Sequence, residues 1–272
     1  MIPAKAIDSA HMRGNFSSHA GDYDRYASVQ KRVVELLCDR MSTFKINNGP
    51  WLDVGTGTGA LAAAILCSEP GQQLVIMDIA HGMTREASQR LPAVSACDGD
   101  AKCLPFADGI FAGVVSSSVY QWVDCLPTAF AEVFRVLKPG GLFALALFGE
   151  KTLHELRASH RQAVADSNKG RLSHAQSFPT LNDVAAAVDL AGLSCCELFS
   201  TMEVEYHLDV PDLLRQLKQI GAGNAAESRP RGLASRWVMH TMMKTYEERY
   251  RCDAGLPASY EVIVAIVEKP QF

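Results

Sequence analysis

The sequence predicts an α/β fold, in which a doubly wound sheet of seven strands is covered by helices on both faces. Apolar segments of strand length alternate with helical segments from about residue 45 onward, which is typical of parallel strands joined by crossover helices. The strand segments are hydrophobic at almost every position, as expected for strands buried on both faces. A glycine-rich turn, GTGTG, follows the first strand, where folds of this class bind ligands.

The elements can be assigned in order from their periodicity and from the residues that break the chain. Apolar residues at helical spacing predict a helix within 23–42, and the turn NNGP ends it. Later helices stop at proline or glycine. The expected strands are WLDV (51–54), LVIMD (74–78), AVSAC (93–97), GIFAGVVSS (109–117), LFALALF (142–148), SCCELFSTMEVEYHL (194–208) and SYEVIVAIVEK (259–269). The expected helices among them are 60–69, 82–91, 126–137 and 181–193.

This assignment divides the chain into three regions with different expected roles. Residues 1–44 form N-terminal cap helices, and 45–150 form a core that binds a nucleotide-like cofactor. Residues 151–272 complete the sheet and carry helical lid inserts at about 151–180 and 206–258.

Composition excludes several classes of function. The net charge is −4, which argues against nucleic-acid binding. No apolar run reaches membrane-spanning length and the N-terminus lacks a signal peptide, so we expect no membrane contact and a cytoplasmic location. The eight cysteines include no CxxC pair, as expected for reduced thiols. The histidines are not at metal-ligand spacing, so we expect no metal.

The turn after the first strand is the main candidate for cofactor binding. Gly55, Gly57 and Gly59 allow the backbone to approach a ligand at a helix N-terminus. Asp53, at the strand end, favours an ammonium group over a phosphate, which it would repel. Asp78 closes the second strand, about where a carboxylate that binds ribose belongs.

These features resemble class I S-adenosylmethionine (SAM) methyltransferases, with their Rossmann-like sheet, over roughly residues 45–150. The resemblance implies that Asp78 holds the ribose and that Met83, in MDIAHGM, lies against the adenine. The segment DGDAKCLPFADGIF resembles the family's loop at the adenine edge, which implies roles for Asp100 and Ala101. VLKPGG, before the fifth strand, is another family feature. Ala112 departs from the family, which usually has Asp there.

The end of the fourth strand bears on the methyl acceptor. It reads VVSSSVYQWV and lacks the Asn/Asp-Pro-Pro-Tyr type of motif of enzymes that methylate base or amide nitrogen. Serines 116–118 line that position, and we include Ser116 among the cofactor-binding candidates; the alternative is that they are turn residues. No evident general base stands near the motifs. A carboxylate needs none because it is already ionised, so an acid substrate is favoured.

Nearly the whole chain resembles the malonyl-acyl-carrier-protein O-methyltransferases of biotin synthesis. The matching stretches are NFSSHAGDYDRYASVQ, SSVYQWV, KTLHELRASHRQA, SFPT, LLRQLKQIGAGN, PRGL and LPASYEVIVAIVEK. The resemblance implies methylation of the free carboxylate of malonyl-acyl carrier protein, or of malonyl-CoA, with SAM as cofactor. It also places Tyr23 near SAM, although a tyrosine on such a helix can equally be a core residue.

The second insert is basic. Residues 211–251 contain eight Lys/Arg and four Asp/Glu in a chain of net charge −4. Arginine binds a carboxylate in a forked geometry, so Arg215 and Arg231, in the matching stretches LLRQLKQIG and PRGL, are candidates to hold the substrate. The alternative is a solvated helical face.

Two other functions stay open. One is a SAM methyltransferase for another small carboxylic acid or a quinone precursor, and the other is a SAM-binding assembly factor without catalysis. An apolar lid would suit a quinone ring, and the basic insert argues against it. We expect a monomer.

Overall fold

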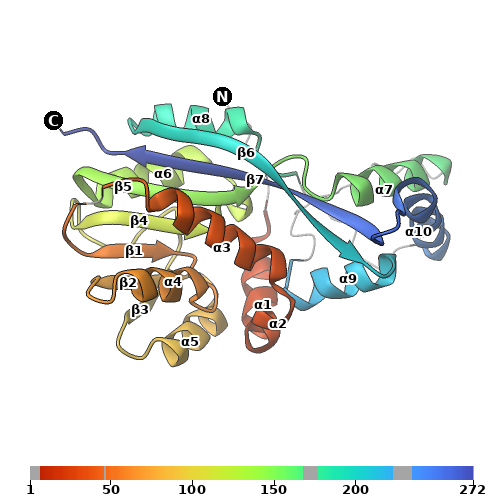
Figure 1. Ribbon diagram of the computed structural model, residues 1–272, viewed down its shortest axis with the longest axis horizontal. Coiled ribbons are helices and arrows are strands. Elements are labelled where there is room, and N and C mark those ends of the chain that lie inside the picture. The colour runs from red at the N-terminus through yellow and green to blue at the C-terminus, as the bar shows by residue number, and fades with distance from the viewer. Residues whose placement is uncertain (1–6, 46, 168–176, 223–234, 272) are drawn as a thin grey trace.

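One seven-stranded sheet forms the centre of the molecule, in accordance with the predicted fold class (Figure 1). This computed structural model describes residues 7–45, 47–167, 177–222 and 235–271. The strands are β1 (Trp51–Val54), β2 (Leu74–Asp78), β3 (Ser95–Asp98), β4 (Phe111–Ser117), β5 (Leu137–Phe148), β6 (Ser194–His207) and β7 (Leu256–Glu268). Their order across the sheet is β3-β2-β1-β4-β5-β7-β6.

Strands β1 to β5 are parallel to one another, whereas β7 is antiparallel to both β5 and β6. The parallel strands are short and buried because helices return the chain across the sheet faces. β7 starts beside the end of β6, where Leu256 pairs with His207, and runs back along it. The expected seven strands are all present, and the fifth begins earlier than expected, at Leu137.

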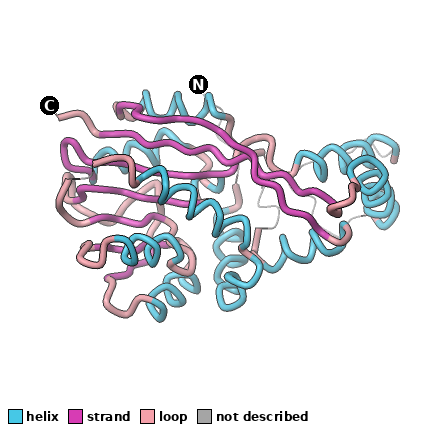
Figure 2. Tube along the Cα trace, in the orientation of Figure 1, coloured by secondary structure: helices cyan, strands magenta, loops and turns pink. Residues whose placement is uncertain are grey.

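Helices cover both faces of the sheet (Figures 1 and 2). Helices α3 (Ser28–Met41), α4 (Ala60–Ser68) and α5 (His81–Arg90) contribute to the hydrophobic cluster on one face. Helices α6 (Leu126–Val136) and α8 (Leu181–Leu190) build the cluster on the other face. Side chains on α6 bury one apolar stripe against the strands, as an amphipathic helix does.

Strands β6 and β7 extend beyond the rest of the sheet as a two-stranded ribbon (Figure 2). Helices α7 (His154–Asp166), α9 (Val210–Gln219) and α10 (Arg236–Tyr250) gather around its far end, where α10 packs on α7. The α9 and α10 helices lie within the predicted 206–258 insert. No helix in the described ranges is long and apolar enough to span a membrane.

The N-terminal region folds as several helices, and the single helix expected over 23–42 is divided in two. The chain forms α1 (Ser9–His19), a short 3-10 turn (Ala20–Asp22), α2 (Tyr23–Tyr26) and then α3. Ala27, with φ −89° and ψ 46°, separates α2 from α3.

Helix α1 packs closely on α5. Gly82 allows this approach, because a Cβ atom there would lie 2.4 Å from the Ser17 carbonyl oxygen. The Gly82 N–H also donates to Ser17 Oγ at 2.9 Å.

Candidate functional site

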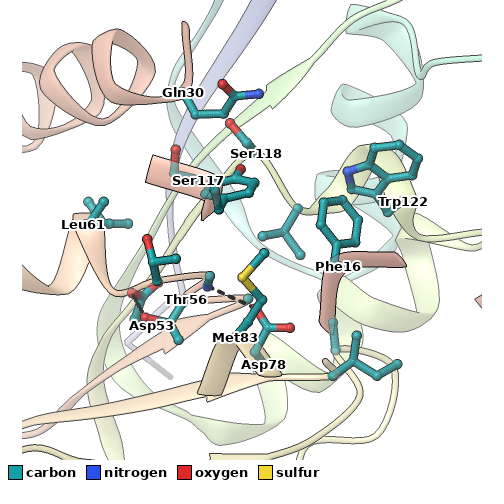
Figure 3. A pocket seen from close by; sticks show the side chains of 18 of the residues that line it. Phe16, Gln30, Asp53, Thr56, Leu61, Asp78, Met83, Ser117, Ser118 and Trp122 are labelled. Atoms are coloured by element: carbon teal, nitrogen blue, oxygen red, sulfur yellow. Dashed lines mark hydrogen bonds between the residues drawn. The ribbon is translucent and has the colours of Figure 1, made fainter. Parts of the chain in front are cut away.

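A cavity lies at the carboxyl ends of β1 to β4, with the N-terminal helices as its opposite wall (Figure 3). Ligands of open α/β sheets bind at this edge. The lining comes from the turns after four strands and from α1 to α3, and it includes Phe16, Tyr23, Asp24, Gln30, Asp53, Thr56, Thr58, Asp78, Met83, Asp100, Ala101, Ser117, Ser118 and Trp122.

The glycine-rich turn forms the floor of the cavity. Gly55, Gly57 and Gly59 have φ of 69°, 57° and 84°, in the left-handed region that favours glycine. A Cβ at Gly55 would collide with Val119 Cγ2 at 2.3 Å, whereas a Cβ at Gly57 would meet nothing within 4 Å. Gly57 therefore faces open space in the cavity. Gly59 is the N-cap residue of α4 and is not part of the lining.

Asp53 is a buried carboxylate at the cavity wall, with 1% of the residue exposed. Its Oδ2 accepts a 2.7 Å hydrogen bond from Thr56 Oγ1, and its Oδ1 has no hydrogen-bond partner among the described residues. Burial, with a further contribution from Asp78, raises the pKa of Asp53 to about 7 despite the bond from Thr56. An unpaired buried carboxylate oxygen is suited to a cationic ligand group.

Asp78 lies on the same side of the cavity. Its Oδ2 accepts from the Gly57 N–H at 2.9 Å and its Oδ1 from the Ala80 N–H at 2.8 Å. Burial raises the pKa of Asp78 to about 6, although both backbone bonds act against the shift. These bonds fix the carboxylate beside the glycine turn, and each oxygen keeps a further lone pair for a ligand hydroxyl.

The other predicted cofactor residues form the adjoining wall. Met83 is buried against Ala80 and Tyr23, and Met83, Asp100 and Ala101 all line the cavity. Asp100 Oδ1 accepts from the Lys102 N–H at 2.9 Å, which closes the loop after β3. The structure thus brings together all the predicted cofactor residues except Gly59 and Ser116.

Ser116 lies outside the cavity lining, contrary to our expectation. It is fully buried in β4, and its hydroxyl donates to the Val54 carbonyl oxygen at 2.8 Å. The next two serines, Ser117 and Ser118, do line the cavity. Side chains alternate between faces along a strand, and a run of three serines does not reveal which of them reaches the cavity.

The N-terminal wall contains Tyr23, as expected, and also Asp24, whose contacts the sequence did not reveal. Burial, Asp78 and Asp24 all raise the pKa of the Tyr23 hydroxyl above its usual value. Asp24 accepts from Thr58 Oγ1 at 2.5 Å and pairs with Arg90 at 3.0 Å. The hydrogen bond between Thr58 and Asp24 therefore connects α2 to the glycine turn. These contacts join residues far apart in sequence, so no local pattern reveals them.

An aromatic pair closes one side. Phe16 from α1 and Trp122, after β4, meet edge to face with ring centroids 5.4 Å apart, the arrangement that aromatic rings prefer. Both residues line the cavity (Figure 3). Their stretches, NFSSHAGDYDRYASVQ and SSVYQWV, were noted in the sequence, but their contact was not foreseen.

Of the two arginines expected to hold substrate, only Arg215 lies within the described residues, and it is not part of the cavity lining. Arg215, on α9, pairs with Asp212 at 3.1 Å, has a side chain 63% exposed, and is absent from the lining. An Asp and an Arg three residues apart on a helix are neighbours, so this pair satisfies the guanidinium locally. Arg231 lies outside the described residues.

Comparison with known proteins gives consistent findings. A family described as "Methyltransferase domain" matches residues 52–145. A Malonyl-[acyl-carrier protein] O-methyltransferase from Geobacter sulfurreducens is 45% identical over 96% of this chain and 98% of its own. The Biotin biosynthesis bifunctional protein BioHC of Teredinibacter turnerae is 35% identical over 94% of this chain and 46% of its own. Among solved structures, the YcgJ protein from Bacillus subtilis matches with a TM-score of 0.58 and 17% identity, over 87% of this chain and 98% of its own, and supports the fold.

Proposed function

Since the chain belongs to the malonyl-[acyl-carrier protein] O-methyltransferase family, we propose that it transfers a methyl group from SAM to the free carboxylate of a malonyl group on acyl carrier protein, as a step of biotin synthesis. It is a methyltransferase by family and fold. The observation that carries the proposed site is the buried carboxylate pair, Asp53 and Asp78, on either side of the open glycine turn.

The residues of the cavity fit SAM. The unpaired Oδ1 of Asp53 is placed to accept from the ammonium group of the methionine part. The space beside Gly57 is open, so SAM can lie close to the backbone there. Asp78 is suited to accept the two ribose hydroxyls, and Met83 and Ala101 offer an apolar surface for a flat base.

The chemistry requires alignment and exclusion of water rather than proton removal. When bound, SAM supplies an electrophilic methyl group on a sulfonium, and the carboxylate oxygen that takes this methyl leaves the C–S electron pair on sulfur. Phe16 and Trp122 wall the cavity and restrict water. A malonyl carboxylate has no proton to lose near neutral pH.

Tyr23 can orient a ligand but cannot act as a base at neutral pH. Its raised pKa, caused first by burial, keeps the hydroxyl protonated. It is therefore a hydrogen-bond donor at the wall that faces Asp78. This role suits an acceptor that is already ionised.

A transfer assay tests the proposal. Purified protein is incubated with SAM labelled in its methyl group and with malonyl-carrier, malonyl-CoA or acetyl-carrier. We expect label in a base-labile ester on the malonyl thioesters and none on acetyl-carrier, which lacks the carboxylate. Equal labelling of acetyl-carrier would contradict carboxyl methylation, and the absence of label on both malonyl thioesters would contradict the proposed substrate.

A further inference from the structure

We infer that Ser117, Ser118 and Gln30 bind the acceptor carboxylate through neutral hydrogen-bond donors, in place of an arginine fork. This inference rests on the proposed function and specifies its acceptor subsite. Ser117 ends β4 and Ser118 follows it, and Gln30 lies on α3, at the same end of the cavity (Figure 3).

The three side chains have unused donors. The hydroxyl oxygens of Ser117 and Ser118 are buried and have no hydrogen-bond partner within the described residues. Gln30 is half-buried at the cavity wall, and its amide makes no hydrogen bond to another described residue. Buried polar groups without partners are uncommon in folded proteins, and a ligand atom would satisfy the two serine hydroxyls. Figure 3 shows them at the end of the cavity away from Asp78.

Ser118 has a backbone conformation that supports a binding role. Its φ of 61° lies in the left-handed region, which is unfavourable for a serine. The Ser118 N–H donates to the Ala146 carbonyl oxygen at 2.8 Å, and Gln121 Nε2 donates to the Ser118 carbonyl oxygen at 2.8 Å. Neighbouring groups thus hold the strained residue in place, a pattern that is concentrated at functional sites.

The cationic side chains in the described lining are already engaged. Lys31 Nζ donates to the Asp24 carbonyl oxygen at 2.6 Å, and Lys102 Nζ pairs with Asp124 at 3.0 Å. Among the described residues, the lining therefore offers a substrate carboxylate hydroxyl and amide donors rather than an unpaired cation.

Neutral donors also suit the reaction. A guanidinium beside a carboxylate would lower the carboxylate pKa and with it the tendency of the oxygen to attack. Hydroxyl and amide donors orient one carboxylate oxygen and leave the other free toward the methyl group. The ester product lacks the negative charge that these donors bind best, which favours its release.

Four variants test this subsite. Ser118→Gly removes the hydroxyl and also relieves the positive φ, so the thermal midpoint should stay equal or rise while kcat/KM for malonyl-carrier falls. Ser117→Ala should lower kcat/KM and Ser117→Thr, which keeps the hydroxyl, should restore most of it. Gln30→Glu places a negative charge against the carboxylate and should raise KM. Each loss should be on the order of 10- to 100-fold, and S-adenosylhomocysteine affinity by calorimetry should change by less than about threefold.

Arg215→Ala is the comparison variant, and its loss should be smaller than that of Ser118→Gly. The inference is overturned if the wild type methylates malonyl-carrier and the serine variants keep full kcat/KM, or if they lose cofactor affinity in parallel with activity. A wild type that methylates neither malonyl thioester overturns the proposed function, and the acceptor assignment with it.

Discussion

Replacing Asp53 by Asn should stabilise the ligand-free protein and weaken cofactor binding. Burial raises the pKa of Asp53 to about 7 from 3.8, so the ionised form is destabilised in the folded state. At about 1.4 kcal/mol per pKa unit, the shift corresponds to a few kcal/mol at pH 8. The Asn amide nitrogen would take the unpaired Oδ1 position and cost part of this gain, which leaves a net stabilisation of about 1–3 kcal/mol.

The raised pKa of Asp53 also determines how the stability difference between the Asn variant and the wild type changes with pH. Between about pH 4 and 7 the unfolded wild type has lost the Asp53 proton and the folded state keeps it, so wild-type stability falls as pH rises. Above pH 7 both states are ionised and the penalty is constant. The advantage of the Asn variant should therefore grow from pH 5 to 7 and then level off.

Two measurements check the predicted effects of Asp53→Asn on stability and on cofactor binding. Thermal unfolding across pH 5 to 8.5 should show the variant above the wild type by about 2–4 °C per kcal/mol. Calorimetry at pH 8 should show about 10- to 150-fold weaker binding of S-adenosylhomocysteine, because a charge-assisted hydrogen bond contributes about 1.5–3 kcal/mol. The reasoning is wrong if the variant is less stable at pH 8, or if its ligand affinity is that of the wild type.

Two further variants probe the cap and the ribose site. Gly82→Ala should displace α1, because the new Cβ would meet the Ser17 carbonyl oxygen at 2.4 Å, and cofactor affinity by calorimetry should fall; Gly71→Ala, where a Cβ meets nothing within 4 Å, is the control and should bind normally. Asp78→Ala should weaken S-adenosylhomocysteine binding by about 2–3 kcal/mol and lower the thermal midpoint, since two backbone N–H groups lose their acceptor; unchanged affinity in the folded variant would refute its role.

The fold was largely predictable because its signals are local. Short apolar segments that alternate with helical segments indicate the strands, and Pro and Gly mark the ends of the helices. The direction of β7 was not predictable, because it depends on the end of the sheet at which the residues after His207 bring the chain back into the sheet. The break at Ala27 was also missed, since the apolar spacing continues across it and only the tertiary contacts of α2 require a bend.

The cofactor side of the site was easier to predict than the acceptor side. Asp53 and Asp78 end strands, so the edge on which they lie follows from the order of elements. The position of Arg215 outside the cavity lining was not predicted, because charge counts on a helix do not tell which of its faces meets the cavity. Asp212, three residues earlier, did indicate a local ion pair. The contact between Asp24 and Thr58 depends on packing of distant segments, which single-sequence patterns do not encode.

The position of β7 has a consequence for the order of folding. It follows β6 in the sequence, yet it lies between β5 and β6 in the sheet. Until the segment Leu256–Glu268 is synthesised, β6 has no strand to pair with and the β5 edge is open. Pairings that span a long connection form slowly, and open strand edges promote aggregation. A nascent chain that stops short of β7 should therefore have a formed cofactor floor and an unfinished sheet, which makes this segment the step that closes the fold.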